Sequence, residues 1–464
     1  MDFPHDFAQP APGDLGRRQF LSRFGMGFGS VALAAMAADQ RLANASESSP
    51  LAQQATHFAA KAKRVIHVFC NGGPSHVDTW DPKPALSKWE GKTIPALGAT
   101  PLPSPFKFTR RGESGIEVSE LFPKLSAHVD KLAVLRAVHT DSPEHKSATL
   151  MMTTGSARLP KPSLGSWVLY GLGTENQNLP GYISIGSGGF GGNKCWGSSF
   201  LPSMYQGTNL RKIASEVERM IENIRNPEFD LAQQRTELDL VQALNQHHFQ
   251  RSNQEANLDA EIQSLELAFR MQSEATSAFD ISGESQSVVK SYGNSEFGKT
   301  LLVARRLAES GVRFVQVFHG TWDHHVAINK NLKTISRECD QPLAALLADL
   351  QRLGMLEDTL VVWGGEFGRT PGYDKRGRGE PGRDHHSDCF SMWMAGGGVK
   401  PGLVYGETDE FGAAGLSGRV HVHDLHATVL HLLGFDHEKL TYRYNGRDFR
   451  LTDVYGNVVQ DIIA

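Results

Sequence analysis

Short apolar runs, each ending at glycine or at a cluster of polar residues, recur through most of the chain. They are rich in β-branched and aromatic residues, and their apolar character is nearly continuous rather than alternating. This pattern predicts strands that are buried on both faces, as in a parallel sheet covered by helices. The predicted strands are residues 64–70, 131–138, 181–186, 312–318, 359–363 and 390–395.

Segments with helical spacing lie between these runs. Gly155 and Gly311 follow two of them, as glycine often follows a helix, and Asp424 is expected to be the N-cap of another that ends at Gly434. Strands that alternate with helices predict an α/β fold with a mostly parallel central sheet and helices on both faces. The predicted helices are residues 146–154, 163–171, 296–310, 339–353 and 425–434.

One stretch departs from this alternation. Residues from about 205 to 280 are rich in Gln, Glu, Arg, Leu and Ala with helical spacing, which predicts a helical insertion in a domain spanning residues 64–464. The pair His247-His248 is expected on its solvated face. The glycine-rich run 186–192 lacks the Lys-Ser/Thr of a phosphate-binding loop, so we interpret it as a flexible loop.

The N-terminus has the pattern of an export signal. Arg17-Arg18 opens a twin-arginine core, an apolar Gly/Ala-rich stretch follows at 24–38, and residues 35–37 fit an A-x-A cleavage site. We therefore expect a twin-arginine signal peptide at 1–38, a linker at 39–63, and a periplasmic or extracellular mature protein. The apolar stretch is short for a bilayer span, so no membrane span is expected in the mature chain.

Composition narrows the functional classes. The formal net charge is −4 and the pI is near 6.6, which gives no indication of a nucleic-acid partner. The four cysteines make no CxxC pair, which argues against a cysteine zinc site. Export would allow a disulfide among them, but their spacing assigns no pair. They are Cys70, Cys195, Cys339 and Cys389.

Polar clusters follow at least four predicted strands, at 71–78, 139–145, 319–325 and from 366 onward. Ligands of open α/β sheets bind beyond the carboxyl ends of strands, so these clusters are expected to meet. The first cluster fits turn chemistry equally well. Carboxylates and imidazoles together suit a divalent metal, zinc in the first place, with calcium or manganese as alternatives. The predicted ligands are Asp323, His325, Glu366, Asp384 and His385.

Several motifs together resemble the domain-of-unknown-function 1501 family, within the alkaline phosphatase and sulfatase-like superfamily. They are NGGPSHVDTWDPKP (71–84), MMTTG (151–155), ARRLAESGVRFVQVFHGTWDHH (304–325), GGEFGRTP (364–371), GRDHH (382–386) and DLHATVLHLLG (424–434). The resemblance implies an alkaline-phosphatase-like α/β/α sandwich. It also implies hydrolysis of phosphate or sulfate esters with one or two metals.

The resemblance carries over unevenly to individual positions. Asp323, His325 and His385 match the ligands of one metal. At the second metal Asn71 stands where an aspartate is expected, and Glu366-Phe367 stands where Asp-His is expected. The nucleophile position falls on His145, so no Cys, Ser or Thr is available there.

Two functional hypotheses follow. The first is an exported metal-dependent hydrolase of sulfate or phosphate esters that uses metal-bound water, with an anionic small molecule or a glycan as substrate. In it His145 is the general base or an extra ligand, and Arg369 binds the substrate's anionic oxygens. The second is a non-catalytic exported protein of the same fold that binds a glycan or a protein partner. The residues at 71, 145 and 367 favour the second hypothesis, and the clustered titratable groups favour the first.

Overall fold

The computed structural model of the protein describes residues 51–94, 99–213, 220, 228–251, 265–267, 269–270, 278–374 and 379–464. The expected signal peptide at 1–38 lies outside this part, as do the side chains of His247 and His248. Within the described residues, no helix is both long and apolar enough to cross a bilayer.

A central sheet organises the described part of the chain, and nine of the described strands belong to it. All its pairings are parallel except those of β11, which runs antiparallel to both of its neighbours. The sequence-based prediction of a mixed α/β fold with a mostly parallel sheet is therefore confirmed. In spatial order the strands are β12 (Leu403–Tyr405), β4 (Leu132–His139), β11 (Phe390–Ala395), β8 (Thr359–Gly364), β1 (Arg64–Cys70), β7 (Phe314–His319), β5 (Tyr182–Ile185) and β6 (Thr208–Leu210), with β15 (Val420–His421) beside β4.

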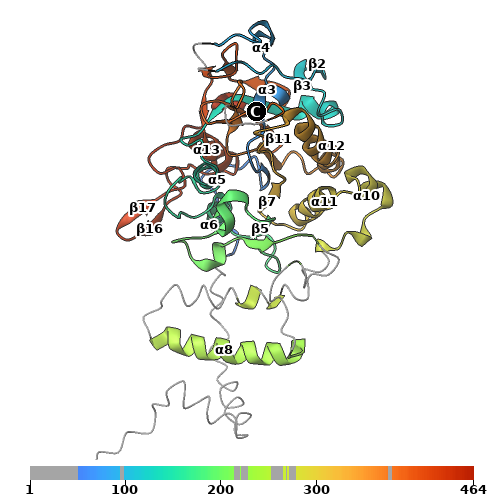
Figure 1. Ribbon diagram of the computed structural model, residues 1–464. Helices are drawn as coiled ribbons and strands as arrows, with labels where there is room; N and C mark the ends of the chain where they lie inside the picture. Colours follow the sequence, from blue (N-terminus) through green and yellow to red (C-terminus); the bar gives the residue numbers. More distant parts are fainter. Residues whose placement is uncertain are drawn as a thin grey trace, which may run out of the picture. The chain divides into compact units, whose positions relative to one another are not determined.

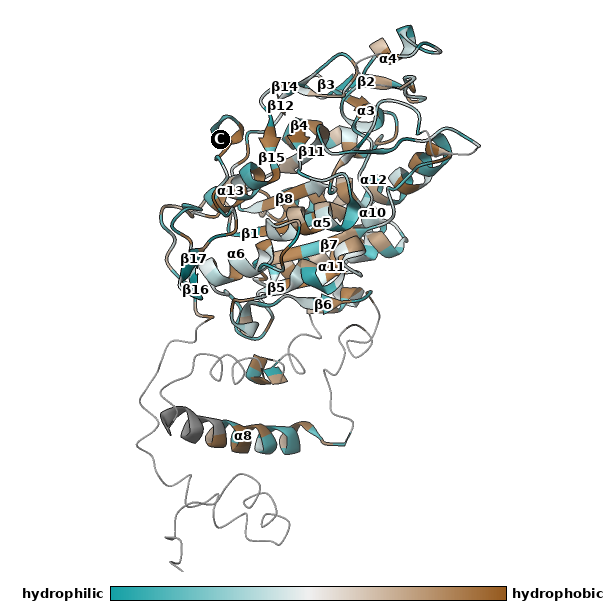
Figure 2. Cartoon of the chain, turned by 60° about the vertical axis from the view of Figure 1, so that its left-hand side comes forward, coloured by the Kyte–Doolittle hydropathy of each residue, from teal (hydrophilic) through white to brown (hydrophobic). Residues whose placement is uncertain are grey.

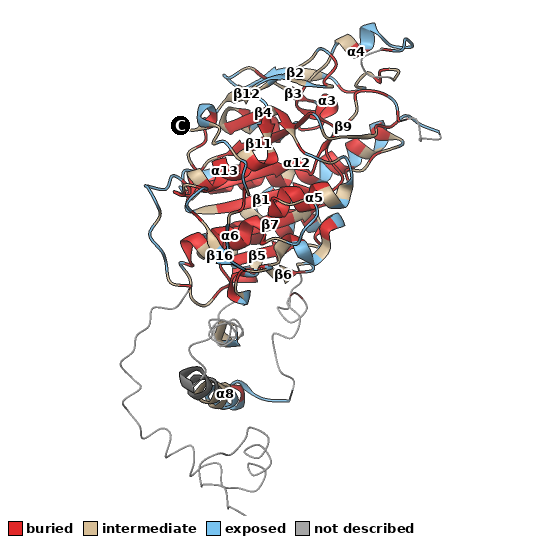
Figure 3. Ribbon diagram, turned by 90° about the vertical axis from the view of Figure 1, so that its left-hand side faces the viewer, coloured by how far each residue is buried: buried red, intermediate tan, exposed pale blue. Residues whose placement is uncertain are grey.

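Each face of the sheet is covered by helices and has its own apolar core (Figures 1 and 3). Along β1, Val65 and Phe69 enter one core, while Ile66 and Val68 enter the other, because successive side chains of a strand point to opposite faces. The hydrophobic residues accordingly concentrate on the strands (Figure 2). One face carries α5 (His145–Thr154), α6 (Leu164–Leu172) and α13 (Val422–Leu432), and the other carries α10 (Gln286–Tyr292), α11 (Glu296–Glu309) and α12 (Ile328–Arg352).

Two helix starts differ from the sequence-based prediction. Helix α12 begins at Ile328 rather than near Cys339, since Ile328, Leu332 and Ile335 extend its buried face by two turns and Pro342 is tolerated inside it. Helix α13 begins at Val422, so Asp424 is not its N-cap. His421 is the N-cap and accepts a hydrogen bond from the His423 amide, and Asp424 in turn accepts one from the His421 amide.

Other expected segments take more definite forms. Part of the expected linker packs on the domain, where the Gln54 amide donates to the Leu172 carbonyl and Leu51 is buried. Within 205–280, residues 208–210 form sheet strand β6 and Leu231–Arg251 forms helix α8. The glycine-rich run leads into a 3₁₀ segment, η4 (Gly189–Trp196). All four cysteines are buried free thiols, so the disulfide considered above is not formed.

Candidate metal centre

The candidate site lies where several strand ends stand at the same level. Cys70 at the end of β1 is in register with His319 at the end of β7, and Phe69 is in register with Gly364 at the end of β8. The antiparallel β11 begins at this same edge, because its first residue, Phe390, pairs with Val138 near the end of β4. The loops that follow β1, β4, β7 and β8, and the loop that precedes β11, therefore converge here.

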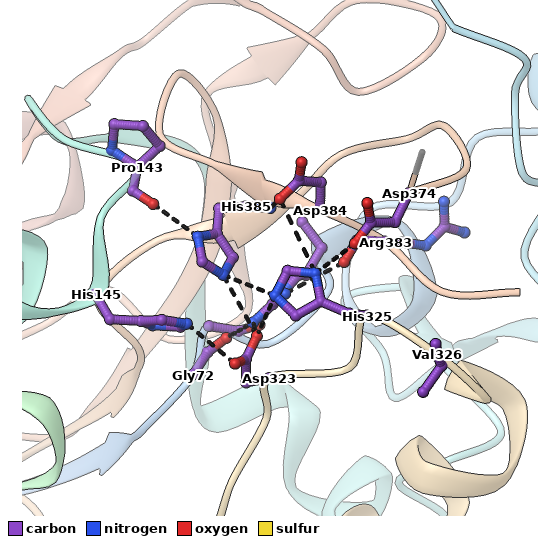
Figure 4. Close-up of polar contacts among 12 residues, drawn as sticks. Gly72, Pro143, His145, Asp323, His325, Val326, Asp374, Arg383, Asp384 and His385 are labelled. Atoms are coloured by element: carbon purple, nitrogen blue, oxygen red, sulfur yellow. Dashed lines mark hydrogen bonds and ion pairs between the residues drawn. The ribbon is translucent and has the colours of Figure 1, made fainter. Parts of the chain in front are cut away.

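Asp323, in the loop after β7, lies at the centre of the cluster (Figure 4). Its carboxylate oxygens are 3.2 Å from His145 Nε2, 2.9 Å from His325 Nε2 and 3.4 Å from His385 Nε2. One ligand atom from each of these four residues lies within 4.8 Å of the others. The structure thus brings Asp323, His325 and His385 together as the sequence predicts, and it adds His145 to them.

Two of the imidazoles are oriented by acceptors behind them. His385 Nδ1 is 2.8 Å from the Pro143 carbonyl oxygen, and His325 Nδ1 is 2.5 Å from Asp374 Oδ2 (Figure 4). A carbonyl or a carboxylate can only accept, so Nδ1 carries the proton in each ring. Nε2 of each ring is then the atom that faces Asp323. Histidine ligands of metals are held in this way by outer partners.

His145, the first residue of α5, is held between two carboxylates. Its Nδ1 is 2.7 Å from Glu366 Oε1 and its Nε2 is 3.2 Å from Asp323 Oδ2. Burial by itself would lower the pKa of His145, but the hydrogen bonds to Asp323 and Glu366 outweigh it and raise that pKa above its usual value.

Glu366 lies behind His145 and outside the group of four. Its side chain is fully buried, and both carboxylate oxygens accept from the Gly72 amide, at 2.9 and 3.1 Å. Gly72 has φ of +104°, and a Cβ there would stand 2.4 Å from the Asp323 nitrogen. Only glycine allows the first strand's loop to approach Asp323 so closely. Phe367, next in the chain, is also buried and packs its ring 4.8 Å from that of His145.

Arg369 is buried, and all three of its guanidinium nitrogens are engaged by protein groups. Nε donates to the Gly73 carbonyl at 3.2 Å, Nη1 donates to the Arg383 carbonyl at 3.2 Å, and Nη2 donates to the Gly72 carbonyl. Nη2 also donates to Asp323 Oδ1 at 2.5 Å. The guanidinium thus binds both the loop after β1 and the carboxylate of Asp323.

The charge of Asp323 is strongly favoured by its neighbours. Burial by itself would raise the pKa of this carboxyl. Hydrogen bonds from His145 and His385, together with the adjacent Arg369, outweigh that effect and hold the pKa well below its usual range. These neighbours therefore favour the charged form of Asp323, which can offer an anionic oxygen to a cation.

Asp384 stands at the rim of the cluster. Its Oδ1 accepts from the His385 amide at 2.8 Å and lies 4.0 Å from His325 Nδ1. With His325 and Asp374 it makes a second group whose ligand atoms lie within 4.8 Å of one another. This second group shares only His325 with the first, and it contacts that ring through Nδ1 rather than Nε2.

Three contributors were missed by the sequence-based prediction. Asp374 is one acidic residue in a loop of several charges, and the Pro143 carbonyl belongs to the backbone, so neither gives a recognisable signal. Phe190 stacks on His145 with ring centroids 4.0 Å apart. Its position inside the glycine-rich run 186–192, beyond the end of β5, was a signal that the prediction did not use.

Comparison with known proteins gives the family. Among curated proteins, no match to the sequence was found. The lipoteichoic acid synthase LtaP from Listeria monocytogenes is similar in structure, with a TM-score of 0.38, 9% identity and coverage of 89% of this chain and 80% of that chain.

Two further solved structures are similar at the same low level. The PsFucS1 sulfatase from Pseudoalteromonas sp. has a TM-score of 0.34 and 14% identity, over 82% of this chain and 69% of that one. The alkaline phosphatase from the Antarctic bacterium TAB5 has a TM-score of 0.34 and 10% identity, over 81% of this chain and 99% of that one. The family model described as "Protein of unknown function (DUF1501)" matches residues 62–463, and the chain belongs to this family.

Proposed function

We propose that this protein is an exported metal-dependent hydrolase of sulfate or phosphate esters. The observation that carries the proposal is the convergence of three imidazole Nε2 atoms on the ionised carboxylate of Asp323. In a protein without a metal role, such a set would leave ring nitrogens crowded around one carboxylate with no packing benefit. The groups behind the rings of His325 and His385 prepare them to bind a cation instead.

The donor set favours zinc among the metals considered. Asp323, His325 and His385 supply two nitrogens and one oxygen, and catalytic zinc sites keep three protein ligands and one open position. Calcium prefers oxygen ligands throughout, so two imidazoles count against it. Manganese is the remaining alternative, because it accepts mixed oxygen and nitrogen ligands. A bound divalent ion would polarise an ester oxygen and lower the pKa of a water molecule beside it.

In this proposal His145 is the general base that takes the proton of the attacking water. Its Nδ1 is engaged by Glu366, so Nε2 is the atom that can accept a proton from an attacking water. No phosphoryl or sulfuryl intermediate anchored on an oxygen or sulfur can form at position 145, since an imidazole takes the place of the usual nucleophile. Phe190 covers the open side of the ring and excludes bulk water from it.

Glu366 and Arg369 receive different roles from those expected from the sequence. We propose that Glu366 positions His145, since both of its oxygens are already held behind that ring. Arg369 is buried with every nitrogen engaged, so we propose that it positions Asp323 rather than contacting substrate. Asp384 remains a proposed outer ligand at the rim of the cluster.

The test uses protein stripped by a chelator and reloaded separately with Zn²⁺, Mn²⁺ or Ca²⁺. We expect about one tightly held ion per chain, and turnover of aryl sulfates or aryl phosphates only after reloading. His145→Ala should lower turnover by roughly 10² to 10⁴-fold while metal content stays near that of the wild type, because a base rather than a ligand is lost. A His145→Ala protein as active as the reloaded wild type would contradict the proposed base.

The binding-protein hypothesis remains the second candidate. Phe367 fills the place where the resemblance expects an imidazole, and Asn71 offers only a neutral amide. If the metal-loaded protein turns over none of the aryl esters, this second hypothesis is favoured.

We also propose export through the twin-arginine pathway, on the sequence of the N-terminus. Replacing Arg17 and Arg18 together by Lys is expected to leave the precursor in the cytoplasm, since the pathway reads the paired guanidinium groups. Cell fractionation followed by immunoblotting measures this directly. Unchanged secretion of the double variant would mean that another signal directs export.

A further inference from the structure

A cavity of about 410 Å³ lies at the same edge of the sheet as the candidate metal centre. Its volume falls in the range of small-ligand sites. The ends of β5 and β7, the start of α11 and one turn of α12 line it. Asn71, at the end of β1, belongs to its wall, so the cavity reaches the loop that also holds Glu366.

His319 in this cavity has a buried donor without a partner. Its Nδ1 accepts from the Trp322 indole nitrogen at 3.2 Å, so in the neutral ring the proton is on Nε2. Burial lowers the pKa of His319 to about 3, which keeps the ring neutral. Nε2 is buried and makes no hydrogen bond, and the closest carboxylate oxygen, Glu338 Oε2, is 3.9 Å away. Such a donor is costly unless a ligand supplies the acceptor.

The remaining lining combines balanced charges with aromatic rings. Arg211 and Lys212 are exposed at the rim, and so are Glu296 and Glu338, so two cations stand against two carboxylates. A neutral ligand that both donates and accepts hydrogen bonds suits this rim better than an anion. Phe297 is buried in the wall, with its ring centroid 4.0 Å from that of His319, and supplies apolar lining. Hydroxyl groups around an apolar ring face are the chemistry of a sugar.

One loop connects the cavity to the candidate centre. Ser187 lines the cavity. Two residues on, Gly189 lies against Asn71, since a Cβ there would stand 1.7 Å from Asn71 Oδ1. Phe190 then stacks on His145 in the centre. A ligand in the cavity therefore lies one loop away from the proposed base.

We infer that this cavity is a carbohydrate subsite that holds a neutral sugar residue of a glycan ester. The identity of the bond that is cleaved rests on the proposed function, whereas binding of the sugar does not. Glu338 and the His319 Nε2 donor would bind hydroxyl groups, and Phe297 would pack against the ring face. The ester group itself would then lie toward His145, across the loop that contains Gly189.

Binding is tested on an array of neutral oligosaccharides printed beside their sulfated counterparts, followed by calorimetric titration with the tightest neutral binder. We expect the wild type to bind neutral oligosaccharides with or without metal. Glu338→Gln and His319→Leu should each weaken binding about tenfold or more, and His319→Gln, which keeps a donor, should recover part of the loss. Arg337→Gln, one residue away on α12 and outside this cavity's lining, is the matched control and should bind as the wild type does.

Two results would overturn the inference. One is the absence of binding to every neutral oligosaccharide, or binding that is unchanged in Glu338→Gln and His319→Leu. The other is binding of sulfated forms alone that is lost in Arg211→Gln with Lys212→Gln, which would make the cavity an anion site.

The subsite and the proposed hydrolase fail separately. Neutral glycan binding without any aryl ester turnover would contradict the proposed hydrolase and support the sugar subsite. Aryl ester turnover without glycan binding would contradict the sugar subsite and support the proposed hydrolase.

Discussion

Asp323→Asn is expected to lose metal binding almost entirely. The Asp323 carboxylate contacts three imidazoles and the guanidinium of Arg369: Oδ1 lies against His325, His385 and Arg369, and Oδ2 lies against His145. Its neutral replacement keeps the shape but removes the charge, and it leaves Arg369 buried without its partner. We expect metal affinity to fall by more than the roughly 10 to 100-fold that is typical when only an outer partner of a ligand is changed. Equilibrium dialysis with a chelator buffer, read by atomic emission, measures the affinity.

Asp374→Asn is expected to weaken metal binding less than Asp323→Asn does. Asp374 touches His325 only through Nδ1, so its loss should misorient one ligand and weaken metal binding by about 10 to 100-fold. Asp448→Asn, in an exposed pair with Arg443 on the hairpin β16 (Tyr442–Tyr444) and β17 (Arg447–Phe449), is the control and should bind metal normally. Should Asp323→Asn retain wild-type affinity, the metal would have to bind elsewhere.

Arg383→Met is expected to cause the largest loss of stability. Arg383 and Asp78 are both fully buried, and Nε and Nη2 of the guanidinium reach the two carboxylate oxygens at 2.7 and 3.0 Å. Removing one partner leaves an uncompensated buried charge, which costs about 3–5 kcal/mol. The midpoint of urea denaturation, followed by circular dichroism, measures the loss.

Two comparisons make this stability prediction specific. The double variant Arg383→Met with Asp78→Leu removes both charges and should be more stable than Arg383→Met alone. Arg443→Met breaks an exposed pair with Asp448 and should cost less than about 1 kcal/mol. Equal losses of stability in Arg383→Met and Arg443→Met would show that the buried pair contributes no more to stability than the exposed pair.

The same pair has a defined dependence on pH. Burial would raise the pKa of Asp78, but the ion pair with Arg383 and the hydrogen bond from Ser75 outweigh it and lower that pKa. A carboxyl whose pKa is lowered on folding contributes stability at every pH above its unfolded value of about 3.9, and that contribution is lost as pH falls through the lower folded value. The wild type should therefore keep this contribution from neutral pH down to about pH 4, which urea midpoints measured across that range will check.

The ion pair also matters for the candidate centre. Arg383 immediately precedes Asp384 and His385, and its Nη1 donates to the Thr370 carbonyl at 3.2 Å. It thereby fixes the loop before β11 against the helix α3 (His76–Thr79), which contains Asp78. A weakened pair should loosen His385 as well as the fold, so Arg383→Met is expected to bind metal more weakly than the wild type.

The hydrophobic pattern predicts most strands of the sheet and those residues of the candidate centre that follow β7 and β8. Six apolar runs become strands within a few residues of the predicted bounds, since strands buried on both faces leave a strong local signal. Because parallel strands end at one edge, the positions of Asp323 and His325 after β7, and of Glu366 after β8, follow from the chain itself. Register and sheet order then require the structure, as does the antiparallel β11 that brings His385 to the same edge.

The sequence by itself determines the α/β class, the strand-end clusters and the family. Tertiary structure alone decides what each clustered side chain does. Arg369 turns inward onto Asp323, and Glu366 holds His145 from behind, because the loops after β1 and β8 pack against each other at Gly72. The direction of a side chain and its partner at a distance of hundreds of residues depend on packing, which no local pattern encodes.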